Sequence, residues 1–341
     1  MAAPQPHRDA DPVSEAEARA RLEPLLREFH DTGLVLAVSG GPDSVALMRL
    51  CAPLAREAGT PACVATVDHA LRPGSAQETE TVALWAAQAR LAHRRLAWAG
   101  PKPESGVQEA ARAARYRLLA QAAREVGAGA LVTAHHRDDQ AETVLMRLAA
   151  GSGVGGLAGM RPRATIDGLA LARPLLDLPK DRLVATCLAR GWPYLEDPSN
   201  AAPRFARARL RRVAPLLAGE GLDAIRLARL AARAARADAA LEAGAEAAFA
   251  RLVRGDAPLA LDAAGLAAEP EEIALRVLAR GVRRVGGSAG YERLSRLEGL
   301  WARLAPAIAA GRPFRGTLGG ALVGHADGLV TIAPEPPRRA G

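Results

Sequence analysis

The sequence predicts an α/β protein with a Rossmann-like parallel sheet, followed by a smaller, mostly helical domain that ends in a β-hairpin. Short, wholly apolar segments alternate with longer helical ones from residue 34 to residue 150, which is typical of parallel strands covered by helices on both faces. From about Pro203 this alternation gives way to long helical stretches rich in alanine, leucine and arginine. Near the C-terminus two short apolar runs, 320–323 and 329–332, flank a polar glycine turn, the pattern of a hairpin.

The first predicted element is a helix that begins near Ser14 and ends near His30. Ser14 and Glu17 have the spacing of a capping box, and the apolar positions recur at helical spacing. Those positions are Ala18, Leu22, Leu25 and Leu26. A strand follows over 34–38, and it ends abruptly in a glycine turn that opens a helical pattern at Val45.

The alternation then continues through three more strands and three more helices. We expect strands over 63–67, 95–99 and 130–133, separated and followed by helices over 76–91, 107–126 and 138–150. Clusters of polar residues follow the strands: SGGPDS (39–44), DHALR (68–72) and HHRDD (135–139). Because ligands bind at the carboxyl ends of parallel strands, these clusters predict the functional site.

Composition and charge exclude several classes of protein. The longest uncharged stretch, 148–160, has 13 residues, fewer than the roughly 18 that a membrane span requires. The N-terminal segment carries acids and no apolar run, so we expect no secretory signal and a cytoplasmic protein. The three cysteines, Cys51, Cys63 and Cys187, form no CxxC pair, which argues against a disulfide framework, a zinc site or an iron–sulfur cluster.

The net charge of +8 is unevenly distributed along the chain. Residues 1–200 hold 23 basic and 23 acidic side chains, whereas residues 201–341 hold 22 and 14. The whole excess therefore lies beyond the predicted parallel sheet. Such a region suits a polyanion, because contacts to phosphates supply much of the affinity for nucleic acids.

The segment Ser39-Gly40-Gly41-Pro42-Asp43-Ser44 carries the strongest chemical signal. Its glycines allow the backbone to approach a ligand, and the free amides at a helix N-terminus together with two hydroxyls form a site for phosphate. A Walker loop is excluded, because no GxxxxGK[ST] pattern occurs in the chain and this segment has no lysine.

A second signal is the acidic helix start that follows His135 and His136. Asp138, Asp139 and Glu142 fall within one turn, where they are either favourable partners of the helix dipole or ligands for magnesium and for the ammonium of a small amine. Adjacent histidines on an extended segment point to opposite sides and cannot chelate one ion together. We favour His135 as a hydrogen-bond donor to a phosphate or as a proton carrier.

Two further patterns need an interpretation. Residues 151–156 spell GxGxxG, but they follow a helix rather than a strand, so we expect a mobile glycine loop at the mouth of the site and not a dinucleotide fingerprint. Five arginines crowd a stretch of nine residues, where they form either a solvated helix face or a phosphate-binding surface. They are Arg204, Arg207, Arg209, Arg211 and Arg212.

The loop SGGPDS resembles the pyrophosphate-binding loop (PP-loop) of the ATP pyrophosphatase superfamily, whose members split ATP into AMP and pyrophosphate. The motifs that follow in order narrow this resemblance to bacterial tRNA(Ile)-lysidine synthetases over about 34–212. They are DHALR (68–72), EAARAARY (109–116), TAHHRDDQAET (133–143), the glycine segment 151–160 and EDPSN (196–200).

The resemblance implies a ligase that forms a carbon–nitrogen bond, with ATP and Mg²⁺ as cofactors. In that family the wobble cytidine (position 34) of tRNA(Ile) with a CAU anticodon is adenylated at its C2 oxygen, and free L-lysine then displaces AMP to give lysidine. The domains implied are an N-terminal tail and helix (1–30), a PP-loop ATP-binding catalytic domain (31–202), a basic linker helix (203–222) and a helical tRNA-binding domain ending in a hairpin (223–335). A homodimer is left open.

The resemblance also assigns roles to residues, each by its matching motif position. The catalytic residues implied are Asp43, Arg112, His135, Asp139, Glu142 and Arg207. ATP would be bound by Ser39, Gly40, Gly41, Pro42, Asp43, Ser44, Asp68 and His69, with Asp43 near the magnesium. Lysine would be bound by Asp139 and Glu142, and tRNA by Arg204, Arg207 and Arg211. The family usually has Arg-Asn where this chain has Arg207-Ala208, so no side-chain role is expected at 208.

Two alternatives stay open at this point. A tRNA thiolase of the same superfamily would use the same adenylation, but it needs paired cysteines or a cluster, and only the distant Cys63 and Cys187 are available as a pair. A catalytically inactive, ATP-regulated RNA-binding protein would keep the basic region without the chemistry. The intact loop and acidic helix disfavour that second alternative.

Overall fold

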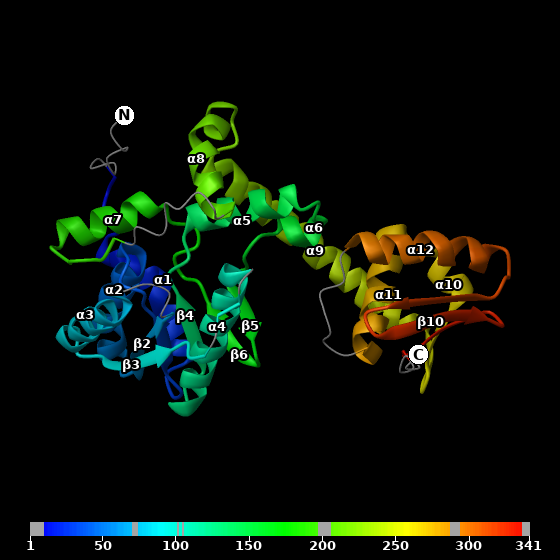
Figure 1. Cartoon of the computed structure of the whole chain (residues 1–341), viewed down its shortest axis with the longest axis horizontal. Coiled ribbons are helices and arrows are strands. Elements are labelled where there is room, and N and C mark those ends of the chain that lie inside the picture. Colours follow the sequence, from blue (N-terminus) through cyan, green and yellow to red (C-terminus); the bar gives the residue numbers. More distant parts are fainter. Residues whose placement is uncertain are drawn as a thin grey trace. The chain divides into compact units, whose positions relative to one another are not determined.

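The computed structural model describes residues 10–69, 74–100, 102–103, 106–196, 206–286 and 294–335 (Figure 1). The chain divides into two compact units, one formed by residues 1–149 and 159–231 and the other by residues 150–158 and 232–341. Along the described residues, none of the helices is long and apolar enough to cross a membrane.

A six-stranded sheet forms the centre of the first unit, with strand order β3-β2-β1-β4-β6-β5. Five strands are parallel, and β5 pairs antiparallel with β6 at one edge. The strands are β1 (Leu34–Ala37), β2 (Ala62–Asp68), β3 (Ala92–Ala97), β4 (Ala130–Thr133), β5 (Arg163–Ile166) and β6 (Leu169–Ala172). The carboxyl ends of β1, β2 and β4 therefore lie at the same edge of the sheet, where the polar clusters follow.

Helices cover both faces of this sheet, as the wholly apolar strands require. Leu34 and Leu36 of β1 are buried in the core formed with α1, α2, α3 and α7, whereas Val35 is buried in the core formed with α4. Figure 1 shows α1, α2 and α3 gathered beside β2 and β3. The helices of this unit are α1 (Glu15–Glu28), α2 (Pro42–Ala58), α3 (Ser75–Gln88), α4 (Val107–Glu125), α5 (Arg137–Ala149), α7 (Lys180–Ala189), α8 (Ala206–Gly219) and the start of α9 (Ala224–Leu252).

The predicted parallel sheet is confirmed, with one addition at its edge. The sequence analysis missed the hairpin of β5 and β6 and the helix α7. Asp167 and Gly168, which join the two strands, have positive φ angles of 48° and 79°, so the Asp-Gly pair was the available hairpin signal. Strand β3 begins three residues before its predicted start of Arg95, because its exposed arginines weaken the apolar pattern.

The second unit contains a five-stranded antiparallel sheet of order β7-β8-β11-β10-β9. The predicted hairpin is confirmed as β10 and β11, whose turn residues Asp327 and Gly328 both have positive φ. The strands are β7 (Val253–Asp256), β8 (Leu259–Asp262), β9 (Phe314–Leu318), β10 (Ala321–Ala326) and β11 (Leu329–Pro334). The helices that share its core are the end of α9, α10 (Ala263–Ala268), α11 (Glu271–Gly286) and α12 (Leu294–Ala309).

The glycine segment 151–156 leads into the helical turn α6 (Val154–Leu157), which belongs to the second unit. Its mobility stays a prediction. A Cβ atom added at Gly153 would lie 2.9 Å from Leu294, and one at Gly155 would lie 2.8 Å from Asp238. A side chain at either position would displace that neighbour, and the segment does not join a strand to a helix as a dinucleotide fingerprint does.

Candidate active site

The loop SGGPDS joins β1 to α2 and is stabilised by its own serines. Gly41 is the N-cap of α2, and Pro42 occupies the first helical position, where its missing N–H removes no helical hydrogen bond. The Ser44 hydroxyl donates to the Gly41 carbonyl at 3.0 Å and accepts from the Ser39 amide at 3.2 Å. The loop is thus held in shape before any ligand arrives.

The two glycines of the loop meet different demands. Gly40 has a φ of 93°, and a Cβ atom there would lie 2.7 Å from the Leu195 side chain. The Leu195 amide also donates to the Gly40 carbonyl at 2.8 Å, so Leu195 holds the loop through both its backbone and its side chain. A Cβ atom at Gly41, by contrast, would meet nothing closer than 3.9 Å. The helix N-terminus at Gly41 is therefore open enough for an anion.

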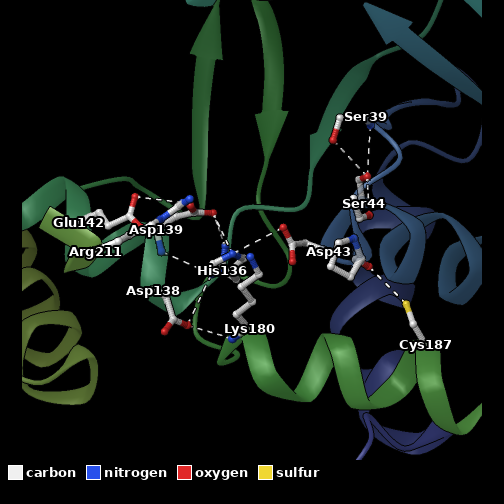
Figure 2. A network of polar contacts seen from close by, with 12 residues as sticks. Ser39, Asp43, Ser44, His136, Asp138, Asp139, Glu142, Lys180, Cys187 and Arg211 are labelled. Atoms are coloured by element: carbon white, nitrogen blue, oxygen red, sulfur yellow. Dashed lines mark hydrogen bonds and ion pairs between the residues drawn. The ribbon is translucent and has the colours of Figure 1, made fainter. Parts of the chain in front are cut away.

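Asp43, in the first turn of α2, points away from the loop toward His136 (Figure 2). Its Oδ2 atom lies 3.6 Å from Nε2 of His136, while its buried Oδ1 atom has no hydrogen-bond partner among the described residues. Burial would raise the pKa of Asp43, but the hydrogen bond and charge of His136, together with the charge of Lys180, lower it. Asp43 is therefore an ionised carboxylate with one oxygen still to be satisfied.

His136 lies at the centre of the site, between three carboxylates (Figure 2). Its side chain is 3% exposed, and Asp139 and Asp138 approach it at 3.4 and 3.6 Å, in addition to Asp43. Burial alone would lower the pKa of His136, but hydrogen bonds to Asp138 and Asp43 and the charges of Asp139 and Asp43 raise it to about 10. The imidazole is thus a buried cation.

Asp138 ties this cluster to a neighbouring helix. Its Oδ2 atom accepts a hydrogen bond from the Lys180 amide at 2.9 Å, at the N-terminus of α7. Burial would raise the pKa of Asp138, but its bonds with His136 and with the Lys180 amide lower it to about 2. Asp138 accordingly has a structural partner on each side.

Asp139 belongs to the cluster around His136, whereas Glu142, one turn further along α5, has a different partner. Asp139 accepts a hydrogen bond from the His136 amide at 3.2 Å, which caps the start of α5. Glu142 receives the Arg211 guanidinium, with Nε 2.5 Å from Oε1 and Nη2 3.4 Å from Oε2. The two carboxylates that the resemblance assigns to lysine are 14% and 11% exposed.

The other predicted residues lie at the ends of β2 and β4 and on α4. His135 follows β4, is 9% exposed, and its Nδ1 atom lies 2.8 Å from the Thr133 hydroxyl. Arg112, on α4, lies over the Tyr116 ring with its Cζ atom 5.1 Å from the centroid. Asp68 ends β2, and His69 follows it, with its ring edge-on to Trp98 at 6.2 Å and a buried Nδ1 atom that has no hydrogen-bond partner among the described residues.

Some predictions fall outside what the structure describes. Arg204 lies outside the described residues, and Arg207 is placed only as a backbone position in α8. Residues 70–72 of the DHALR motif and the end of the EDPSN motif are likewise outside them. The sequence analysis in turn missed His136 and Lys180 as members of the site, although His136 stands where the acidic helix is capped.

Comparisons with known proteins agree with this geometry. Residues 14–217 match the PP-loop domain family. Over 336 residues the chain is 59% identical to the tRNA(Ile)-lysidine synthase of Methylobacterium sp. (strain 4-46), with 97% of each protein covered. The chain belongs to the tRNA(Ile)-lysidine synthase family.

Other tRNA(Ile)-lysidine synthases and one solved structure extend the comparison. The enzyme of Methylobacterium nodulans is also 59% identical, and that of Bradyrhizobium sp. (strain BTAi1) is 50% identical over 349 residues and 96% of each chain. The U34-tRNA thiolase NcsA from Methanococcus maripaludis superposes with a TM-score of 0.54 at 15% identity, covering 64% of this chain and 77% of that one. At that identity the thiolase shows the shared fold alone.

Proposed function

We propose that this protein ligates free L-lysine to C2 of the wobble cytidine of tRNA(Ile) with a CAU anticodon, using ATP and releasing AMP and pyrophosphate. One observation carries the proposal within the structure. His136 joins Asp43 of the phosphate-binding loop to Asp139, and Glu142, the second carboxylate suited to an amine, lies one turn further along α5. Such a site brings a nucleotide and a cationic substrate close together, and family membership specifies which pair of substrates they are.

In the first step the cytidine C2 oxygen attacks the α-phosphate of ATP, and the bond to pyrophosphate breaks. The amides and hydroxyls of the loop 39–44 receive the departing pyrophosphate, because they stand at the open N-terminus of α2. Arg112 and His135 donate hydrogen bonds to the oxygens of the α-phosphate, where negative charge develops. Asp68 and His69 contact the nucleoside part of ATP at the end of β2.

The donor atoms of the site fit a magnesium ion of the kind that accompanies ATP. Among the described residues no three or more His, Cys, Asp or Glu side chains are arranged so that they could hold a metal ion by themselves, but Mg²⁺ typically takes one or two carboxylates and completes its shell with phosphates and water. The unpartnered Oδ1 atom of Asp43 is suited to that role. When bound, the ion would neutralise charge on the phosphates of ATP.

In the second step lysine attacks the activated base. Asp139 and Glu142 attract the cationic substrate and orient it, and one of these carboxylates accepts a proton from the ε-ammonium. The neutral ε-amine then forms the bond to C2 while the bond from C2 to the oxygen of AMP breaks. Most of the acceleration comes from holding the two reactants in place rather than from covalent catalysis by the protein. His136 keeps Asp139 and Asp43 at fixed positions across the site.

We assign binding of the tRNA to the basic part of the chain, which begins after residue 200. Arg204, Arg207 and Arg211 precede or belong to α8, and the excess of positive charge begins in the same region. Phosphate contacts from such residues position an RNA without reading its bases. A cytoplasmic location and a homodimer stay predictions.

The proposal is tested by incubating the purified protein with ATP, Mg²⁺, radiolabelled lysine and unmodified tRNA(Ile) that carries a CAU anticodon. We expect label in the tRNA, with one AMP released for each lysine incorporated. Absence of label while a control enzyme is active in the same mixture would contradict the assignment. Unlabelled tRNA with tight ATP and RNA binding would instead favour the inactive RNA-binding protein.

A further inference from the structure

The ion pair between Arg211 and Glu142 places the protein's own cation on a carboxylate that the proposed reaction needs. Arg211 lies on α8, 69 residues after Glu142, and its guanidinium approaches both oxygens of the carboxylate. The Glu142 side chain is 11% exposed, so the pair is largely shielded from solvent on that side. A guanidinium held by two hydrogen bonds is a close mimic of a bound ammonium substrate.

Glu142 cannot bind the Arg211 guanidinium and the amine of the substrate at the same time without loss of affinity for one of them. A carboxylate has one negative charge, and a second cation beside Arg211 would be repelled by it at close range. The Arg211 side chain is 38% exposed, which leaves it free to swing outward along its flexible stem. The geometry therefore describes two alternative occupants of one carboxylate, the Arg211 guanidinium and the amine of the substrate.

The sequence of α8 indicates which kind of ligand could compete with Glu142 for Arg211. The helix Ala206–Gly219 carries four arginines and no acidic residue. A polyanion that lies along this helix would offer phosphate oxygens to Arg211, and these compete with Glu142 because the guanidinium fork fits a phosphate as well as a carboxylate. RNA is the polyanion that the proposed reaction itself brings to the site.

We propose that Arg211 occupies the amine-binding carboxylate Glu142 until RNA binds, and thereby couples the binding of lysine to the binding of tRNA. The inference rests on the proposed function, in which Glu142 binds lysine. In the free protein Arg211 lowers the affinity for lysine; in the complex Arg211 moves to a phosphate of the RNA and leaves Glu142 free. Linkage then requires lysine and tRNA to strengthen each other's binding by the same factor.

The test compares Arg211→Ala with the matched variant Arg212→Ala, in which the exposed neighbouring arginine of the same helix is removed. Lysine binding is titrated calorimetrically with the wild type and both variants, with and without the tRNA, in the presence of a non-hydrolysable ATP analogue and Mg²⁺. In the absence of RNA, Arg211→Ala should bind lysine about two- to fivefold more tightly than the wild type, the range expected for a partly exposed ion pair.

Arg211→Ala should also bind tRNA more weakly and lose most of the dependence of lysine affinity on tRNA. These opposite shifts, tighter lysine and weaker tRNA, are the signature of the proposal. Arg212→Ala should weaken tRNA binding without changing the affinity for lysine in the free protein. The wild type should bind lysine more tightly when tRNA is present than when it is absent.

Three results would overturn the inference. Weaker lysine binding by Arg211→Ala would mean that Arg211 contacts the lysine substrate directly, for example at the carboxylate of the lysine. Unchanged lysine affinity would mean that the ion pair does not compete, and a fall in melting temperature with both affinities reduced would mean that it only fastens α8 to α5. Failure of the proposed function is distinguishable from all three, because then the wild type itself transfers no lysine to tRNA.

Discussion

Each unit of this protein contains a cation surrounded by three carboxylates, and the two clusters differ in how completely they are satisfied. In the first unit His136 contacts Asp43, Asp138 and Asp139, which come from α2 and α5. In the second unit Arg276 of α11 contacts three acids of α9 and α11. These acids are Asp238 at 2.9 Å, Glu242 at 2.6 Å and Glu272 at 2.8 Å.

The Arg276 cluster fastens two helices to each other and is closed. Its acids lie on the same helix or on the one packed beside it, and the planar guanidinium offers enough donors for all of them. The His136 cluster, by contrast, keeps a buried oxygen of Asp43 without a partner among the described residues and adjoins an open helix N-terminus. An ionic cluster that only stabilises a fold satisfies its members, whereas one that binds ligands leaves an atom for them.

The largest difference between the clusters should appear when one carboxylate of each is neutralised. Asp43→Asn removes the charge that faces His136 and the oxygen proposed to hold magnesium, so we expect lysine transfer to fall by roughly 10²–10³-fold, the usual cost of losing one charge-stabilising group. Asp238→Asn is the matched variant in the Arg276 cluster and should keep nearly the wild-type kcat/KM. Equal activities of the two variants would mean that the His136 cluster is not part of the active site.

Glu142→Gln should affect lysine more than ATP. The substitution keeps the shape of the side chain but removes the charge that attracts the amine, so we expect the KM for lysine to rise by about tenfold or more. The KM for ATP should change by less than twofold, roughly, because the loop 39–44 is untouched. Steady-state kinetics with each substrate varied in turn measure both values, and parallel rises in both would contradict the assignment of Glu142 to lysine.

His136→Asn should destabilise the first unit in a pH-dependent way. Removing the buried cation leaves three carboxylates without their partner, at a cost of about 2–4 kcal/mol. Because the folded pKa of His136 is raised from 6.5 to about 10, its stabilisation is complete below pH 6.5 and is lost as pH rises through about 10. The difference in unfolding free energy between wild type and variant should therefore shrink across that window, as measured by urea unfolding without nucleotide or metal. A difference that is independent of pH would mean that the imidazole is neutral in the folded protein.

Arg276→Met should lower the stability of the second unit and leave the chemistry unchanged. The Arg276 side chain is 13% exposed, but two of its acids are more than 40% exposed, so water compensates part of the loss. We expect a cost of about 1–3 kcal/mol, less than for His136→Asn. Calorimetric melting reports the loss, and the rate of lysine transfer at a temperature where the protein stays folded should match that of the wild type. A lower rate in the folded variant would give Arg276 a role in the reaction.

The smallest expected effect concerns the exposed arginines of α9. Arg229→Gln and Arg233→Gln should each weaken tRNA binding modestly and make its dependence on salt shallower, by about one unit of slope per lost phosphate contact. Arg27→Gln, an exposed position on α1, is the control and should leave the slope unchanged. Binding titrations at several salt concentrations measure the slope. If Arg27→Gln changed it as much as the α9 variants, the basic region after residue 200 would have no special part in RNA binding.

Local patterns made much of the fold and part of the site predictable. The strand, glycine turn and helix at 34–45 are encoded within a few residues, and so is the capping box that Ser14 completes by accepting from the Glu17 amide at 3.2 Å. The antiparallel strands β7 and β9 escaped prediction because they are short and only partly buried, and β8 escaped it because its buried apolar run has only three residues. Strand β7 has no fully buried position, and β9 has one.

The centre of the site was less predictable, because its contacts join distant parts of the chain. His136 and Asp43 lie far apart in sequence and meet only when β1 and β4 pair side by side. Likewise, the chain reversals through β5, β6 and α7 determine where α8 can bring Arg211 to Glu142. Residue types and spacing, together with the family resemblance, identified Asp43, Asp139 and Glu142 as candidates, and the tertiary structure adds the cation that joins Asp43 to Asp139.

Analysis of the nucleosides of the tRNA after reaction tests the central claim most directly. Wild-type protein, ATP, Mg²⁺, lysine and tRNA(Ile) with a CAU anticodon are incubated, and the tRNA is digested and examined by mass spectrometry, with Asp43→Asn and Asp238→Asn in parallel. We predict lysidine in place of the wobble cytidine with the wild type and with Asp238→Asn, and unmodified cytidine with Asp43→Asn. Unmodified cytidine with folded wild-type protein, while a control enzyme is active in the same mixture, would contradict the account. A sulfur-containing base formed when a sulfur donor is supplied would contradict it as well.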